Sequence, residues 1–177
     1  MISATASAAT PLAATDPGWF EELYRSSLAD VHAYVGSLLR DGAAAEDITA
    51  IAFERAYRRR VIFNPGRGSA RAWLFGIARN AALDELRRRR RTAALLGDVP
   101  VDDEPAFEDE DRRLRNQTVR VALERLDPAQ RELILLKFHA QLSNAELAKV
   151  LGCSVSNAGT RLCRALDRLR EACDVAS

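Results

Sequence analysis

The sequence lacks the features that mark secreted, disulfide-rich or membrane-spanning proteins. Its three cysteines, Cys153, Cys163 and Cys173, form no Cys-x-x-Cys pair, which argues against a disulfide framework or a zinc module and favours plain thiols in a reducing compartment. No apolar run approaches the roughly 20 residues that span a bilayer. Residues 1–15 are small and uncharged, without the basic start and apolar core of a secretion signal. We therefore expect a cytoplasmic protein without membrane insertion, and a disordered tail over residues 1–15.

Arrangements of catalytic or cofactor-binding residues are also missing. His32 and His139 fall in different predicted domains, and the cysteine spacing matches no metal signature. The segment Gly66-Arg67-Gly68 lacks the lysine and the spacing of a phosphate-binding P-loop. The sequence thus predicts a protein that is not an enzyme and that needs no metal or other cofactor.

Charged residues are present in quantity and are segregated along the chain, although the net charge is only +1. Residues 55–91 are rich in arginine and hold only two acids, whereas residues 98–111 hold many acids and no base. This pattern indicates a polyanion-binding surface beside a solvated connector. Consecutive arginines at 87–91 point around a whole helix, so they cannot all contact one ligand. Solvation of a helix end stays open as an alternative, but the local excess favours nucleic acid.

The first half of the chain predicts three helices around one core. Asp16 and Pro17 start a helix that ends near Arg40, a second runs over 43–61, and a third runs over 70–91. Pro65, Gly66 and Gly68 prevent regular helix between the last two, and Ser69 can cap the third. The residues expected to face the core are Phe20, Leu23, Tyr24, Leu28, Val31, Val35, Leu38, Ile48, Ala52, Phe53, Ala56, Tyr57, Trp73, Leu74, Ile77 and Ala81.

The second half predicts a connector followed by a helix-turn-helix. Residues 92–113 lose the helical period and gain prolines and acids, so they are predicted to form a flexible acidic linker. Residues 114–126 are predicted to be helical, and Asp127-Pro128 starts a helix with apolar contacts from Leu133, Ile134, Leu136 and Phe138.

A capping box at Ser143-Asn144-Ala145-Glu146 begins a short helix that Gly152 ends, and the last helix is expected over about 156–173. Such a pair of helices normally places its second member in the DNA major groove. No strand is predicted, so the expected fold class is all-α.

Side chains near the loop at 63–69 are able to contact an unstacked base. Trp73 and Phe75 offer aromatic faces and Asn80 offers hydrogen bonds, which together with the nearby arginines suits single-stranded DNA. The periodic position of Trp73 nevertheless favours packing in the core over stacking on a base. Phe63 is compatible with both roles.

Two segments resemble a known family. The sequence AEDITAIAFERAYRR (45–59), the loop after it and SARAWLFGIARNAALDELRRRR (69–90) resemble the promoter-melting σ2 domain of extracytoplasmic-function (ECF) sigma factors, bacterial factors of the sigma-70 family that start transcription. The sequence LERLDPAQRELILLKFHAQLSNAELAKVLGCSVSNAGTRLCRALDRLRE (123–171) resembles their σ4 domain. Two matches in the right order are far more specific than a lone helix-turn-helix. They imply an alternative sigma factor with a σ2-like domain at 16–91, a linker at 92–113 and a σ4-like domain at 114–177.

The resemblance also implies three sets of site residues. Core-polymerase contacts are expected at Glu46, Asp47, Ile48, Glu54 and Arg55. Contacts with the minus-ten promoter element are expected at Asn64, Arg67, Gly68, Ser69, Arg71, Arg79, Asn80 and Arg87. Contacts with the minus-thirty-five element are expected at Ser156, Asn157, Thr160, Arg161 and Arg164.

The implied partners are proteins and DNA. They are bacterial core RNA polymerase, through the clamp helices of its largest subunit and the flap of its second-largest subunit, promoter DNA in double-stranded and melted form, and an anti-sigma factor. The chain departs from the family pattern in the last helix, where Ala158 stands at a usually β-branched position and Gly159 at a usually basic one. Glycine inside a helix costs about 1 kcal/mol relative to alanine, so a looser or repositioned recognition helix is expected there.

Two other functions remain as alternatives. A free-standing helix-turn-helix repressor or activator would explain residues 123–171 but not the loop and the arginines of the first half. Such a regulator binds duplex DNA unaided, usually as a dimer. An adaptor that binds only protein would use its arginines for solubility, and salt or DNA would then leave its complexes unchanged.

Overall fold

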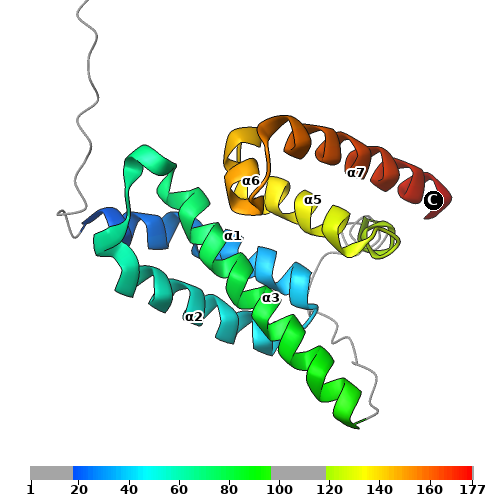
Figure 1. The fold of residues 1–177 in the computed structure, drawn as a ribbon. Coiled ribbons are helices and arrows are strands. Elements are labelled where there is room, and N and C mark those ends of the chain that lie inside the picture. The colour runs from blue at the N-terminus through cyan, green and yellow to red at the C-terminus, as the bar shows by residue number, and fades with distance from the viewer. Residues whose placement is uncertain (1–17, 97–118, 177) are drawn as a thin grey trace, which may run out of the picture.

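The computed structural model describes residues 18–96 and 119–176, and every regular element in these two ranges is a helix (Figure 1). The expected all-α fold is confirmed. The expected tail at 1–15 lies outside the described residues, as does the expected connector beyond Leu96. The elements are α1 (Gly18–Leu39), α2 (Gly42–Arg59), η1 (Arg60–Ile62), η2 (Pro65–Arg67), α3 (Ala70–Leu96), a helical stretch at 119–124, α5 (Pro128–Ala140), α6 (Asn144–Leu151) and α7 (Val155–Ala176).

The predicted helix caps are present with good geometry. The Asp127 carboxylate accepts hydrogen bonds from the backbone N–H groups of Ala129 and Gln130, and Pro128 occupies the first turn of α5. Ser143 and Glu146 form the predicted capping box of α6. Gly152 ends α6 at φ 66°, a left-handed conformation that glycine adopts without strain. These caps satisfy backbone groups that would otherwise lack partners at the helix ends.

Helix α3 is longer than the sequence analysis predicts. It was expected to end near Arg91, but it continues to Leu96, so the first residues of the expected linker are helical. Residues 92–96 contain no glycine or proline, and alanine and leucine have high helix propensity. The Thr92 hydroxyl also donates to the Arg88 carbonyl at 3.2 Å. The last turns of α3 consequently project beyond the ends of α1 and α2 (Figure 1).

Several residues predicted to face the core are instead at the surface. Tyr24, Leu28 and Tyr57 are 42%, 36% and 51% exposed, and Phe138 is 61% exposed. The periods of α1, α2 and α5 are correct, but each apolar stripe is wider than the face that the neighbouring helices cover. Some apolar side chains of α1 and α2 therefore lie on the outer face of the first domain.

The core is continuous across the two halves of the chain. Helices α1, α2 and α3 pack on one another, and α5 and α6 pack against α1 and α3, so one cluster of buried apolar residues extends from Leu23 to Ala165. Tyr34 of α1 and Phe75 of α3 lie at its centre, fully buried, with their rings edge to face at 5.6 Å. The second domain thus rests directly on the first (Figure 1).

Among the helices of residues 18–96 and 119–176, none has the length and the apolar composition that crossing a membrane requires.

Candidate nucleic-acid and polymerase interfaces

The loop between α2 and α3 has a defined shape that its own residues impose. The Asn64 side-chain carbonyl accepts a hydrogen bond from the Gly66 N–H at 2.9 Å, which closes a tight turn, and Pro65 begins the short helix η2. Gly68 follows at φ 148°, where a side chain would be strained. The Ser69 hydroxyl then accepts from the Ala72 N–H at 3.1 Å and caps α3, as predicted. The exposed residues Asn64 and Arg67 are therefore held on a rigid turn.

Aromatic rings beneath this loop pack on one another. The Phe63 ring stacks on Trp19 with centroids 5.1 Å apart, and the Trp73 ring lies 5.1 Å from Phe63 at a tilt of 42°. This cluster assigns Trp73 to packing, as the sequence favoured, and it gives Phe63 the same role. Phe75 is fully buried in the core, so the expectation that it could stack on a base is wrong. The loop is supported by aromatic packing from below.

Residues expected to contact the minus-ten element follow α3 but differ in their surroundings. Asn80 is exposed, and Arg87 is exposed with an ion pair to Asp84 at 3.0 Å. Arg71 and Arg79, in contrast, point to the second domain, where Arg79 pairs with Glu132 of α5 at 2.8 Å. Asn64, Arg67, Asn80 and Arg87 are thus open to solvent, whereas Arg71 and Arg79 are occupied within the chain.

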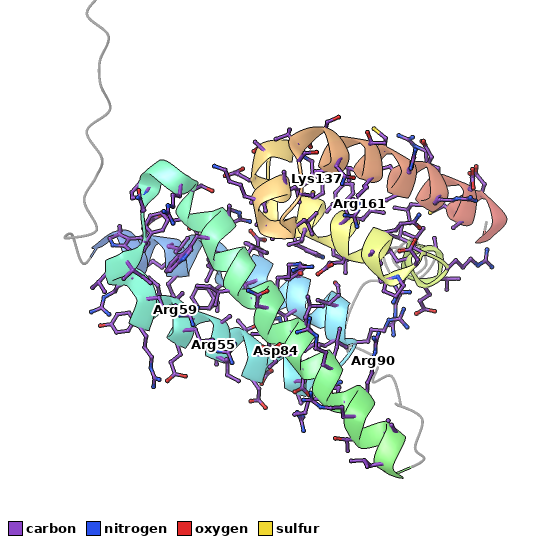
Figure 2. All side chains as sticks on the ribbon, in the orientation of Figure 1. Arg55, Arg59, Asp84, Arg90, Lys137 and Arg161 are labelled. Atoms are coloured by element: carbon purple, nitrogen blue, oxygen red, sulfur yellow. The ribbon has the colours of Figure 1, made fainter. Side chains whose placement is uncertain are left out.

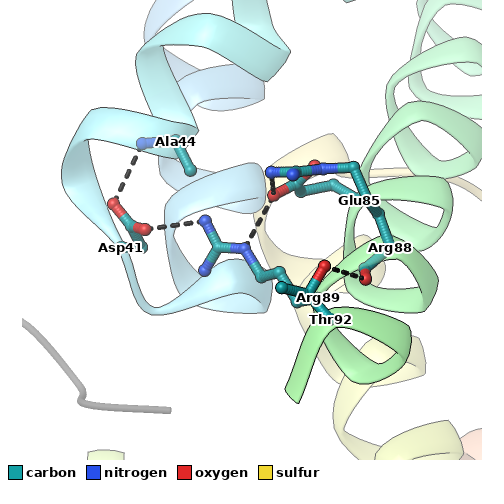
Figure 3. Close-up of polar contacts among 6 residues, drawn as sticks. All are labelled: Asp41, Ala44, Glu85, Arg88, Arg89 and Thr92. Carbon is teal, nitrogen blue, oxygen red and sulfur yellow. Dashed lines mark hydrogen bonds and ion pairs between the residues drawn. The ribbon is translucent and has the colours of Figure 1, made fainter. Parts of the chain in front are cut away.

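The basic end of α3 is partly neutralised by acids of the same domain (Figure 3). Glu85 accepts hydrogen bonds from Arg88 at 2.7 Å and from Arg89 at 2.8 Å, and Arg89 also pairs with Asp41 at 2.6 Å. The hydrogen bond from Arg88, with that from Arg89, lowers the pKa of Glu85 to about 2. The backbone N–H of Ala44 and then Arg89 lower the pKa of Asp41. These contacts tie the start of α2 to α3, and they leave Arg90 and Arg91 without an acidic partner in the described part of the chain.

The expected polymerase-binding residues of α2 do not all share its outer face. Glu46, Asp47, Glu54 and Arg55 are exposed, and Figure 2 shows Arg55 on the α2 ribbon, away from the second domain. Ile48, by contrast, is only 8% exposed and packs in the core. Its placement corrects the expectation that its side chain forms part of the exposed face.

A groove beside these acids was not foreseen. Its lining comes from the outer faces of α1 and α2, and the residues are Tyr24, Leu28, Ala29, His32, Glu46, Thr49, Ala50 and Phe53. The sequence assigned Tyr24 and Leu28 to the core because apolar periodicity does not reveal which part of a wide stripe is covered. Because Glu46 is one of the lining residues, one of the expected polymerase-binding acids lies next to exposed apolar surface.

The expected minus-thirty-five residues form one exposed stripe on α7. The stripe consists of Ser156, Asn157, Thr160, Arg161 and Arg164, all of which are exposed. Their spacing of three and four places them on one side of the helix, opposite the buried residues Ala158, Leu162 and Ala165. A Cβ at Gly159 would lie 3.7 Å from the Asn144 side chain, an ordinary contact, so packing does not require glycine there. Arg168 and Arg170 are exposed and pair with Glu171 and Asp167.

The second domain therefore presents a helix-turn-helix with an open recognition stripe, and the first domain presents a rigid loop and a basic helix. In the part of the chain that the structure describes, no group of His, Cys, Asp and Glu is placed to hold a metal ion. These features define a two-domain DNA-binding protein.

Comparison with known proteins identifies the family. Residues 23–92 match the family model for sigma-70 region 2, and residues 116–169 match the model for sigma-70 region 4. The chain is 32% identical over 154 residues to the RNA polymerase sigma factor CarQ of Myxococcus xanthus, covering 86% of this chain and 87% of that protein. It is also 32% identical over 164 residues to the ECF RNA polymerase sigma factor RpoE of Cereibacter sphaeroides, covering 88% and 87%.

Solved structures agree with this assignment. The sigma factor RpoE in complex with the anti-sigma factor NepR from Bartonella quintana matches with a TM-score of 0.77 and 28% identity, over 88% of this chain and 97% of that one. CnrH in complex with the cytosolic domain of CnrY matches with a TM-score of 0.68 and 26% identity, over 92% of each chain. The chain belongs to the ECF sigma factors, non-enzymatic factors of transcription initiation.

Proposed function

We propose that this sigma factor binds core RNA polymerase in the cytoplasm, recognises a promoter through a minus-thirty-five and a minus-ten element, and promotes melting of the DNA at the second. The observation that carries the proposal is the joint presence of an open recognition stripe on α7 and a rigid, arginine-flanked loop before α3. The proposed domains are residues 16–91 and 114–177, with α3 of the first domain extending to Leu96 and the proposed linker following it. One surface suited to duplex DNA and a second suited to single-stranded DNA, both in one chain, match a promoter with two separate elements.

For the minus-ten element, the loop Asn64–Ser69 is the proposed site for a base that has left the stack. Unstacking a base costs a few kcal/mol, so the pocket that receives it must be formed in advance. The turn closed by Asn64 and Gly66 supplies such a fixed backbone. Because Asn64 Oδ1 is committed to this turn, a base contact by Asn64 would use its amide NH₂ group. Asn80, exposed on α3, is the second proposed base contact.

For the minus-thirty-five element, α7 is the proposed recognition helix in the major groove. Asn157 and Arg161 lie near its start, where helices of this kind reach base edges. Arginine donates two parallel hydrogen bonds to guanine, and asparagine pairs similarly with adenine. The partial positive charge at the start of α7 adds an attraction for phosphate, although the Asn157 N–H is already bonded to the Ser154 hydroxyl.

Polymerase binding is assigned to both domains. The exposed charges Glu46, Asp47, Glu54 and Arg55 on α2, beside the apolar groove of α1 and α2, are the proposed surface for the clamp helices of the largest subunit. The second domain is the proposed partner of the flap of the second-largest subunit. Charged rims beside apolar patches are typical of specific protein interfaces. An anti-sigma factor is a further proposed partner, supported by the similarity to RpoE and CnrH in their complexes.

The decisive experiment combines the purified protein with sigma-free bacterial core polymerase and genomic DNA of the host, and maps the 5′ ends of the transcripts. Discrete starts preceded by two shared short elements are expected. An Arg161→Ala variant should lose the starts that depend on the upstream element, whereas Arg168→Ala, on the same helix but paired with Glu171, should keep them. Absence of starts together with absence of polymerase binding would favour a duplex-binding regulator instead.

A further inference from the structure

The end of α2 and the short helix η1 expose apolar side chains close together. Val61 and Ile62 of η1 are 69% and 73% exposed, and Tyr57, in the last turn of α2, is half exposed. Single apolar residues at a surface are ordinary, but three within six positions indicate a contact surface. Together with Arg59 and Arg60, these three residues are called the α2-end patch below.

Arg60 lies flat against Tyr57 within this patch. Its guanidinium carbon is 3.7 Å from the centroid of the Tyr57 ring, which is a cation–π contact. Arg60 Nη1 also donates to the Tyr57 carbonyl at 2.8 Å, so the guanidinium is held from two sides. Nucleic-acid bases stack on guanidinium planes as they do on aromatic rings. The pair therefore forms a preformed stacking platform.

The platform is braced by the aromatic cluster beneath the loop before α3. The Tyr57 ring meets Phe20 edge to face with centroids 5.4 Å apart. Phe20 in turn lies 5.7 Å from Trp19, on which Phe63 stacks. Contacts of this kind fix ring orientations, so little side-chain entropy remains to be lost when a ligand binds. The aromatic cluster thus connects the platform to the loop proposed to capture a base.

Free positive charge lies beside the platform. Arg59 and Arg67 are exposed, and no acid among the described residues pairs with either. Figure 2 shows Arg59 toward the end of α2, away from the second domain. Arg58, in contrast, pairs with Glu54 at 2.6 Å. Unpaired arginines beside a stacking plane match a single DNA strand, whose phosphates are negative and whose bases are flat. An acidic protein surface would satisfy the charges and leave the plane unused.

The position of the patch also suits a strand that enters the loop. Arg60 and Asn64 are four positions apart in the sequence, so at most about 14 Å of chain separates them. One strand of a duplex advances about 3.4 Å per nucleotide, and a stretched strand advances further. A strand with one base in the loop at Asn64–Ser69 can therefore reach the platform within about four nucleotides.

We propose that the α2-end patch is a second single-strand site, separate from the loop before α3. A base near the captured one stacks on the platform of Arg60 and Tyr57, Arg59 contacts a phosphate, and Val61 and Ile62 contact the apolar faces of the sugar and base. Stacking accepts any base, so this site adds affinity for an open strand without adding sequence specificity. The proposal rests on the proposed function, because it assumes that this domain receives the melted minus-ten strand.

The test uses holoenzyme reconstituted from the full-length protein and bacterial core polymerase. Its affinity for a labelled DNA single strand that carries the mapped minus-ten element is measured by fluorescence anisotropy. Tyr57→Leu should weaken strand binding about tenfold, because the stacked base loses its support. Tyr57→Phe keeps the ring and should bind the strand as wild type does.

Two matched arginine variants separate stacking from charge. Arg60→Lys keeps the charge but loses the flat group, so it should also weaken strand binding about tenfold. Arg58→Lys, the same change at the exposed residue paired with Glu54, should have no effect. The dependence of strand affinity on salt gives an independent readout. Its logarithmic slope should stay unchanged in Tyr57→Leu and Arg60→Lys, and should fall by about 0.7 in Arg59→Gln, which loses one phosphate contact.

Equal strand affinity in wild type, Tyr57→Leu and Arg60→Lys would overturn the proposal. A fall in core-polymerase affinity, with unchanged strand affinity of the saturated holoenzyme, would overturn it as well and assign the patch to a protein contact. If circular dichroism shows that Tyr57→Leu does not fold, Arg60→Lys against Arg58→Lys decides the question.

The wild-type holoenzyme distinguishes a failure of this site from a failure of the proposed function. If wild type binds the strand and the variants bind it equally well, only the second site is wrong. If the wild-type holoenzyme binds no strand with the minus-ten element, the proposed function fails together with the second site.

Discussion

At the scale of single residues, ion pairs decide which arginines remain available to a ligand. The sequence predicted a basic block but could not rank its members, because acids from other helices enter the same region. Asp41 lies 48 positions from Arg89 in sequence, yet the two side chains are 2.6 Å apart (Figure 3). Arg90 and Arg91, toward the projecting end of α3, have no acidic partner among the described residues, so their charge remains available to a ligand. Figure 2 shows Arg90 near that end.

Asp41 has two roles that substitutions can separate. Its carboxylate caps α2 through the Ala44 N–H at 2.9 Å and pairs with Arg89 at 2.6 Å. Asp41→Ala should lower the free energy of unfolding by about 1–2 kcal/mol, since a lost cap costs about 1 kcal/mol and a largely solvated pair less. Asp41→Asn keeps an acceptor for the cap and should cost less than Asp41→Ala. Urea unfolding of both variants measures the difference, and equal losses would contradict the cap assignment.

The same carboxylate gives this stability a pH dependence. Its pKa in the folded protein lies below the ordinary 3.8, because the bonds from Ala44 and Arg89 favour the charged form. A depressed carboxyl pKa means that the contribution is present above the ordinary value and is lost as the pH falls through the folded value. The difference between wild type and Asp41→Ala should therefore be constant near neutral pH and shrink below about pH 4.

Asn80 offers a single-residue test of base reading. It is exposed on α3, and no described residue donates to or accepts from its side chain. Asn80→Ala should reduce promoter opening about tenfold, the size of one hydrogen-bonded base contact, and leave polymerase binding intact. Permanganate footprinting of the melted strand and a polymerase-binding assay measure the two effects. Thr92→Ala on the same helix serves as control, and a parallel loss of opening and polymerase binding would argue for a structural role.

At the scale of helices, the sequence predicted most starts and ends because they depend on local chemistry. The caps at Asp127 and Ser143, the glycine end at Gly152 and the turn at Asn64 were all foreseen from a few adjacent residues. The predicted end of α3 near Arg91 is wrong, because the apolar period stops there but the helix continues to Leu96. Helix propensity continues through Ala93 and Ala94 even though Ala94 and Leu95 are exposed. Periodicity reports burial, and helices can extend beyond the surface that buries them.

One prediction about polymerase binding concerns an exposed acid of helix α2. Asp47 is exposed, and its neighbour Ile48 is fixed in the core, so a change at Asp47 should leave the fold intact. Asp47→Arg reverses a charge on the proposed interface and should weaken binding to core polymerase by about tenfold, chiefly through slower association at low salt. Glu171→Arg, a reversal at an exposed position of α7, is the control. Unchanged affinity of a folded Asp47→Arg protein would remove Asp47 from the interface.

At the scale of the whole molecule, the packing of one domain on the other was beyond the sequence. The family resemblance assigned Arg79 to a DNA contact. Nothing in the sequence of α5 indicated that Glu132 would be buried against Arg79. Tyr34 fell outside the apolar stripe predicted for α1, yet it is fully buried, with its ring edge to face on Phe75 of α3. Contacts between segments on opposite sides of a connector have no local signature. The family resemblance predicted the two domains, but only the structure shows how they contact each other.

The domain interface also contains a histidine whose charge should control it. His139, at the end of α5, is half-buried against α1, with Nε2 3.4 Å from the Ser37 hydroxyl. Burial lowers the pKa of His139 below its ordinary 6.5, while the carboxylate of Asp30 on α1 opposes part of that effect. The Arg71 guanidinium, which donates to the His139 carbonyl, is the nearby positive charge. The packed arrangement of the two domains therefore accommodates the neutral imidazole better than the charged one.

Protonation of His139 should open the domains in a defined pH range. Because the pKa is depressed while the two domains are packed together, the packed arrangement has its full advantage over separated domains above pH 6.5 and loses it as the pH falls toward the lower value. Each unit of depression changes the ratio of packed to separated domains by about tenfold. Fluorescence energy transfer between a dye on the exposed Cys163 of α7 and a dye on a cysteine introduced at the exposed Glu22 of α1 should therefore decrease between about pH 7.5 and about pH 5.5. His139→Gln should abolish that decrease, whereas His32→Gln, in the groove of α1 and α2, should retain it. An unaltered pH profile in His139→Gln would show that another group controls the opening.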